Sequence, residues 1–179
     1  MKHTWLTVLL SSMLVISCGG SGGDSSTDIP KSDDITNLAN TAWIKECSPY
    51  NKLSSDDSNT AWNVITKLSI DDELKSTYRT EYFRPEDTLC ETREFDSIDV
   101  STFDIKSKVI SDESIAAYGL NETFIYNSGN GVTSPMYTLI YVNSERLYFG
   151  QSSGANTGET ASTRHSSISL DNYFIQQVN

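Results

Sequence analysis

Apolar and polar side chains alternate with a period of two over most of the chain after residue 38. Residues 61–70 show this pattern most clearly, because the positions on one face are mostly apolar: Trp62, Val64, Thr66, Leu68 and Ile70. Side chains of a β-strand point alternately to the two faces of a sheet. The alternation therefore predicts a strand with one buried face.

Similar short segments follow one another down to the C-terminus. Turn-forming residues separate them, as in the acidic turn 71–73 and the glycine-rich segment 127–131. A long polar loop, 152–162, precedes the last of them. After a first strand that begins near residue 38 and the strand in 61–70, we expect strands at residues 74–84, 88–95, 102–110, 122–127, 136–143, 146–151 and 167–178.

This succession of strands predicts an all-β fold. Eight or nine short antiparallel strands joined by hairpins favour an up-and-down barrel, because closure of the sheet removes its exposed edges. A β-sandwich is the alternative. No segment keeps the helical period for more than a turn or two, and no unit recurs at a fixed spacing, which argues against a solenoid or propeller.

The N-terminal segment does not follow the strand pattern. A positive start, residues 1–3, precedes a mostly apolar stretch, 5–16, which is shorter than the roughly 20 residues of a membrane-spanning helix. The segment ends in Val15-Ile16-Ser17-Cys18 and resembles the signal of bacterial lipoproteins. The resemblance implies cleavage before Cys18 and attachment of lipid, palmitate included, to that cysteine. An ordinary signal peptide is the alternative.

Residues 19–28 contain no apolar side chain and predict a flexible tether that extends to about residue 34. Its root-mean-square reach would be roughly 20–25 Å. Gly19 follows Cys18 where lipoproteins of enteric bacteria that stay at the inner membrane carry Asp, so the resemblance implies the outer membrane. The expected organisation is a cleaved signal (1–17), a lipidated tether (18–34) and a β-barrel domain (35–179).

The chain is strongly acidic. Residues 1–17 contain one basic residue, Lys2, and no acidic one, so the remaining chain has 12 basic and 24 acidic residues and a net charge of −12. This charge argues against binding to nucleic acid or to anionic lipid through a basic patch. It predicts solubility. Capture of a basic partner or a divalent cation, for example a weak calcium site in 56–59, is the alternative.

Cys47 and Cys90 remain once Cys18 is assigned to the lipid. Exported proteins fold in an oxidising compartment, so this even pair predicts a disulfide. It would close a loop of about 43 residues and stabilise the fold by roughly 4 kcal/mol. Two thiols and His165, the one histidine after residue 17, are too few ligands for a zinc site, so we expect neither a metal nor a cofactor.

Short motifs resemble the lipocalin-like domains of bacterial lipoproteins. Residues 38–43, which end in Trp43, resemble the opening of that group, as does Cys47 four residues later. Cys90 follows an aromatic strand, as in that group. Three later segments complete a resemblance that spans roughly 38–176: 118–123, 146–150 and 171–173. It implies a lipocalin-like barrel and no particular activity, since most of the group has no assigned biochemical function.

Aromatic side chains on the strands are the candidate ligand contacts. The interior of an eight-stranded barrel is either filled by side chains or holds one small ligand. An enclosed apolar cavity of about 300 Å³ or more would favour a ligand, whereas a solid core would favour a structural role. Alternation should direct a good share of these aromatic side chains inward, and the candidate ligand contacts are Trp43, Trp62, Tyr78, Tyr82 and Tyr141.

We find no catalytic constellation in the sequence. His165 has serines nearby, but no Gly-x-Ser-x-Gly elbow is present, and we expect this histidine on an exposed loop or strand edge. The acidic clusters 56–57 and 71–73 are expected in turns. The sequence thus predicts a non-catalytic lipoprotein of the cell envelope, with two candidate roles: binding of a small apolar ligand, or a structural or protein-interaction module.

Overall fold

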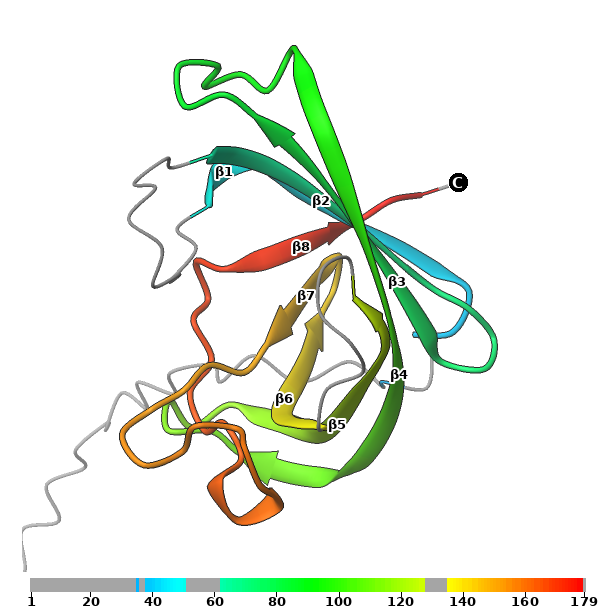
Figure 1. The fold of residues 1–179 in the computed structure, drawn as a ribbon. Coiled ribbons are helices and arrows are strands. Elements are labelled where there is room, and N and C mark those ends of the chain that lie inside the picture. The colour runs from blue at the N-terminus through cyan, green and yellow to red at the C-terminus, as the bar shows by residue number, and fades with distance from the viewer. Residues whose placement is uncertain (1–34, 36–37, 51–61, 128–134, 179) are drawn as a thin grey trace, which may run out of the picture.

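The computed structural model describes residues 35, 38–50, 62–127 and 135–178. Eight antiparallel strands form a closed barrel in which each strand pairs with the next and β8 returns to β1 (Figure 1). The strands are β1 (Thr41–Tyr50), β2 (Trp62–Ile70), β3 (Lys75–Phe83), β4 (Arg93–Ile110), β5 (Ala116–Asn127), β6 (Met136–Asn143), β7 (Arg146–Phe149) and β8 (Tyr173–Gln176). A short 3-10 helix, η2 (Ala161–Thr163), lies between β7 and β8.

This architecture confirms the predicted all-β, up-and-down barrel and excludes the sandwich. The boundaries of β2, β3 and β6 agree with the predicted strands to within one residue at each end. Alternation is clearest in the second half of β2, where Leu68 and Ile70 are buried and Lys67 and Ser69 are exposed.

Other strand boundaries differ from the prediction. The predicted strands 88–95 and 102–110 belong to one strand, β4, which starts only at Arg93. The preceding residues form a turn, because the Asp87 carboxylate accepts hydrogen bonds from the backbone N–H groups of Glu91 and Thr92 at 3.1 and 2.8 Å. β8 is shorter than the predicted segment 167–178, because the chain around Ile168 packs outside the barrel wall.

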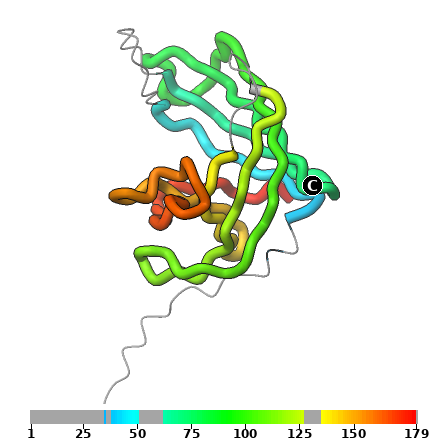
Figure 2. The backbone as a smooth tube through the Cα atoms, turned by 60° about the horizontal axis from the view of Figure 1, so that its bottom comes forward, coloured from blue at the N-terminus to red at the C-terminus, as the bar shows by residue number. Residues whose placement is uncertain are grey.

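The connections lie at two ends of the barrel. We call one end the base; it carries the β2–β3, β4–β5 and β6–β7 turns and the start of β1. The other end, the mouth, carries the β3–β4 connection, the end of β1 and the start of β8. β4 and β5 run side by side along one wall between the two ends (Figure 2).

The interior near the base is filled by side chains. Trp43 is 2% exposed there, and its indole N–H donates to Thr41 Oγ1 at 2.8 Å. The other buried members of this core are Ile35, Leu38, Leu68, Ile70, Phe103, Leu120, Ile140 and Leu147. Ile35 and Leu38 precede β1, so the chain enters the barrel domain at its base.

A second buried layer lies outside the barrel wall. The β7–β8 connection, drawn in orange and red in Figure 1, packs along β5 and β6. Arg164 fixes it there, because its guanidinium donates to the backbone oxygens of Leu120 at 2.6 Å and Thr138 at 2.9 Å. The buried members of this layer are Ile115, Ala117, Leu139, Tyr141, Tyr148 and Ile168.

Cys47 and Cys90 form the predicted disulfide, with their Cα atoms 5.9 Å apart. It joins β1 to the β3–β4 connection. The predicted signal, lipidated cysteine and tether (1–34), the acidic residues 56–59 and the glycine-rich residues 128–131 lie outside the described residues. In the described parts of the chain, no helix is both long and apolar enough to cross a membrane.

Candidate functional site at the barrel mouth

The barrel wall is open beside the start of β8. β8 pairs with β1 at two positions, Trp43 with Gln176 and Ile44 with Ile175. β1 therefore continues past the start of β8 toward the mouth. A half-open cavity of about 200 Å³ lies inside this gap, between β1, β2, β7 and β8. It is smaller and less enclosed than the cavity of about 300 Å³ or more that would favour a ligand on volume alone.

A bulge in β1 decides which side chains face this cavity. Lys45 pairs with Thr66, but Ser48, three residues later, pairs with Val64, two residues earlier on β2. One extra residue in β1 shifts its alternation by one position. Because of this shift, Ser48 and Tyr50 line the cavity together with Lys45. Without the bulge, strict alternation would place Lys45 on one face of β1 and Ser48 and Tyr50 on the other.

The cavity lining that β2, β7 and β8 contribute is apolar except for Thr66. Val64 contributes a side chain that is 4% exposed, and Phe149 and Phe174 contribute rings that lie 5.9 Å apart at nearly right angles. These rings also pack against the core of the base. The cavity floor is thus the top of the barrel core, and a ligand there would rest on fixed apolar side chains.

Lys45 is the charged residue of the cavity lining. Its ammonium donates a hydrogen bond of 2.6 Å to the side-chain oxygen of Asn172, which also lines the cavity. Partial burial lowers the pKa of Lys45, since loss of water disfavours the charged form. Among the residues that the structure describes, no carboxylate oxygen lies within 4.0 Å of its nitrogen.

An aromatic cluster continues from the cavity toward the solvent. Tyr82 stacks on Phe95 with ring centroids 4.5 Å apart, and Trp62 meets Phe95 edge-on at 5.0 Å. Tyr50 joins the cavity to this cluster through an edge contact with Tyr82 at 5.8 Å. Phe95 is 46% exposed and Tyr50 is 36% exposed, so the mouth presents aromatic surface to solvent.

Burial raises the pKa of Tyr50, and the nearby Tyr82 and Asp99 reinforce the shift. The Tyr50 hydroxyl therefore stays protonated at neutral pH and remains a hydrogen-bond donor beside the cavity.

A buried polar network lies beneath the cavity. Glu122 is 2% exposed, and its carboxylate accepts a 2.7 Å hydrogen bond from Ser101. Tyr78 also hydrogen-bonds to Glu122, and its ring lies 6.4 Å from the Phe149 ring of the cavity floor. Burial raises the pKa of Glu122, against the opposing effect of the hydrogen bonds from Ser101 and Tyr78. The pKa of Tyr78 is raised well above its usual range, first by burial and then by Glu122.

The structure separates the five aromatic residues selected from the sequence. Trp62 and Tyr82 lie in the cluster at the mouth, and Tyr78 lies just below the cavity. Trp43 packs in the core of the base. Tyr141 lies on the outer side of the wall under the β7–β8 connection, so its expected inward direction is wrong. Alternation could not show this, because the connection buries the outer face of β6 as well.

The sequence did not single out Lys45, Asn172 or Glu122. Lys45 lies two residues after Trp43, where alternation places an inward side chain. A charged residue at an inward position was the sequence feature that could have indicated a site. Asn172 reaches the cavity through the path of the β7–β8 connection, which the sequence does not reveal.

His165 lies on the β7–β8 connection, as expected, but is partly buried. Its Nδ1 lies 3.0 Å from Thr138 Oγ1 and 3.1 Å from the Gly150 oxygen, and its Nε2 lies 3.1 Å from the Thr157 oxygen. Gly158 packs on the ring: a Cβ at this residue would lie 2.5 Å from Nε2, and its φ of +78° favours glycine. The ring therefore anchors the connection to the barrel.

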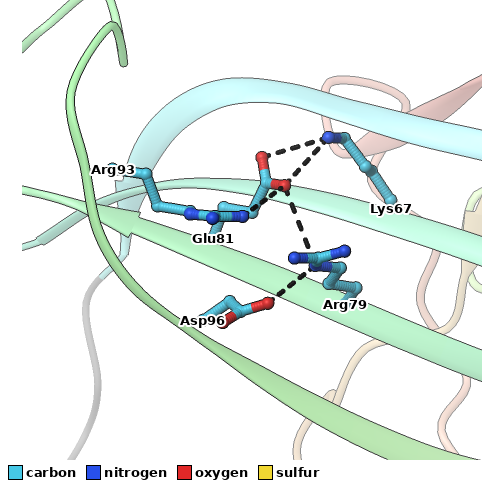
Figure 3. Close-up of polar contacts among 5 residues, drawn as sticks. All are labelled: Lys67, Arg79, Glu81, Arg93 and Asp96. Carbon is cyan, nitrogen blue, oxygen red and sulfur yellow. Dashed lines mark hydrogen bonds and ion pairs between the residues drawn. The ribbon is translucent and has the colours of Figure 1, made fainter.

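Charged residues on the outer face of β2–β4 form a compact network (Figure 3). Glu81 is 8% exposed and accepts from Lys67 at 2.9 Å, while Arg93 and Arg79 lie 3.6 and 3.9 Å from it. Arg79 also pairs with Asp96 at 2.7 Å. The cations of this network have carboxylate partners, which distinguishes them from Lys45.

The described residues contain no group of three or more histidine, cysteine or acidic side chains arranged to hold a metal ion. Comparison of the chain with protein-family models, with curated proteins and with solved structures finds no match.

Proposed function

We propose that this protein is a lipid-anchored binding protein of the bacterial cell envelope, with a lipocalin-like barrel that takes up a small, mostly apolar ligand at its mouth. The half-open cavity beside the start of β8 is the observation that supports this role. It joins a rigid apolar floor to an exposed aromatic cluster, and ligand sites typically combine apolar walls with a few polar groups.

The cavity limits the ligand to a small molecule. Its volume of about 200 Å³ lies below the roughly 300–1,000 Å³ of common ligand pockets. It exceeds an engineered cavity of about 150 Å³ that holds benzene. The proposed ligand therefore has a body of about one ring inside the cavity, and any longer part extends over the aromatic cluster.

The proposed anchor is compatible with an accessible mouth. Ile35 and Leu38 place the entry of the chain at the base, at the opposite end of the barrel from the cavity. A lipid on Cys18, joined by the tether 19–34, would hold the domain by this end and leave the mouth accessible.

Replacement of Cys18 tests the anchor. We expect that Cys18→Ser abolishes incorporation of labelled palmitate and releases the protein from the membrane fraction. Ser17→Ala, which keeps a small residue before Cys18, is the matched control and should keep both. Unchanged labelling and membrane association in Cys18→Ser would refute the lipoprotein assignment.

Tryptophan fluorescence tests the binding site. After the predicted cleavage the chain keeps two tryptophans, Trp43 in the core and Trp62 at the mouth. Titration of the lipidated protein with benzyl alcohol should change the emission of Trp62. Trp62→Phe should remove the response, and Ser48→Phe, which places a ring in the cavity, should weaken binding about tenfold or more.

The alternative is a structural or protein-interaction module. The buried core around Trp43 favours it, since side chains of the described residues occupy the base half of the barrel. A fluorescence response that is absent, or that is the same in Ser48→Phe, would support this alternative and contradict the binding role.

A further inference from the structure

We propose that the ligand of the mouth cavity is a small organic carboxylate, with its anionic group on the Lys45 ammonium and its apolar body against Phe149 and Phe174. This inference rests on the proposed binding function and adds the chemical class of the ligand. The argument starts from Lys45, a cation on the lining of a cavity in a strongly acidic chain.

The hydrogen bonding of Lys45 is incomplete within the described residues. An ammonium group has three donors. One of them reaches the neutral amide oxygen of Asn172 at 2.6 Å. Lys67 and Lys106 differ, because each contacts a carboxylate: Lys67 contacts Glu81 at 2.9 Å and Lys106 contacts Asp104 at 2.6 Å. Lys45 thus has a positive charge and donors for a group that the described chain does not supply.

The position of Lys45 favours an anion over water alone. Partial burial lowers the pKa of Lys45 because the ammonium has lost some of its hydration. An anion placed beside it would restore the stabilisation of the charge, and a partly buried pair interacts more strongly than a pair at the surface. Ser48 lies on the same β1 side of the lining, where its hydroxyl can donate to a second carboxylate oxygen.

The remaining lining specifies the rest of the ligand. Val64, Phe149 and Phe174 form most of the lining on the other strands. Thr66 of β2 adds a hydroxyl, and this part of the lining carries no charge. A fully hydrophilic anion such as phosphate would leave this surface uncovered. A carboxylate with an aromatic or branched aliphatic body matches both sides of the cavity. Its anionic group would contact Lys45, and its apolar body would contact the apolar side chains.

Benzoate and benzamide test the inference, because they have nearly the same shape and differ in charge. We expect isothermal titration calorimetry on the lipidated protein in detergent to give about tenfold or more tighter binding of benzoate than of benzamide. Lys45→Met should weaken benzoate binding by about the same factor and leave benzamide within about twofold. Lys45→Arg keeps the charge and should retain most of the preference for benzoate.

Each outcome decides between the claims. Equal binding of benzoate and benzamide to the unmodified protein, or a preference that survives Lys45→Met, would overturn the anionic ligand and leave the proposed binding function standing. Failure of both compounds to bind at up to about 10 mM would overturn both. The comparison of the two compounds on the unmodified protein remains decisive if Lys45→Met does not fold.

Discussion

Glu122 is an ionisable residue in the barrel interior, where most buried side chains are apolar. Its carboxyl group is buried beneath the mouth cavity and is held by Ser101 and Tyr78. Burial raises its pKa, so the folded protein binds the proton more tightly than the unfolded chain does. The stability from this effect is fully present below the pKa of the unfolded chain and is lost as pH rises toward the folded pKa.

We therefore expect Glu122→Gln to be more stable than the original protein at neutral pH, because glutamine has no charge to bury. The difference should shrink as the pH falls from the raised pKa of the folded protein to the usual range of a glutamic acid side chain, and should stay constant below that range. Thermal unfolding of both proteins over a series of pH values measures it. Glu159→Gln is a control at an exposed position of the β7–β8 connection, which should not share this dependence. A Glu122→Gln protein that is less stable at neutral pH would contradict the account.

At the scale of elements, the disulfide and the bulge in β1 act on the same segment. The bulge lies between Lys45 and Ser48, and Cys47 within it is bonded to Cys90 of the β3–β4 connection. The bond ties the mouth end of β1 to the rest of the barrel, where β8 no longer pairs with it. The bond and the bulge together hold Lys45 and Tyr50 on the cavity side.

We expect the double change Cys47→Ala and Cys90→Ala to lower the free energy of unfolding by about 4 kcal/mol, because the open loop gains conformational freedom in the unfolded state. Denaturant unfolding of the original and changed proteins measures the loss. Reduction of the original protein is the matched control and should give a similar decrease. Equal stability of the oxidised, reduced and changed proteins would show that the bond contributes nothing.

The elements differ in how far the sequence predicts them. β2 follows from alternation, because Leu68 and Ile70 on its inner face are buried while Lys67 and Ser69 between them are exposed. The acidic turn 71–73 was also predictable: the Asp71 carboxylate accepts from the backbone of Glu73 at 3.0 Å and of Lys75 at 2.8 Å. The β7–β8 connection was not, because Arg164 and His165 hold it through contacts with residues distant in sequence, which no local pattern records.

The same limit applies to the candidate site. Trp62 and Tyr82 could be selected because they are large aromatic side chains on inward positions. Tyr141 satisfies the same criterion and lies on the other side of the wall. Lys45 could be placed on the inner face of β1, but its contact with Asn172 depends on where β8 begins, which is a property of the closed barrel.

At the scale of the whole molecule, the barrel has two unlike ends. The base is filled by the core around Trp43 and receives the chain from the predicted tether. The mouth combines the cavity, the aromatic cluster and a cation, while the molecule after residue 17 has a net charge of −12. This polarity supports a protein that is held at one end and binds at the other.

Native mass spectrometry of the protein, gently extracted from its own cells, tests this central claim most directly. The account predicts that a fraction of the protein retains a small molecule, and that this additional mass is absent from the Ser48→Phe variant, whose cavity is filled. Protein that carries no additional mass beyond its lipid, or the same additional mass in Ser48→Phe, would contradict a ligand in the mouth of the barrel.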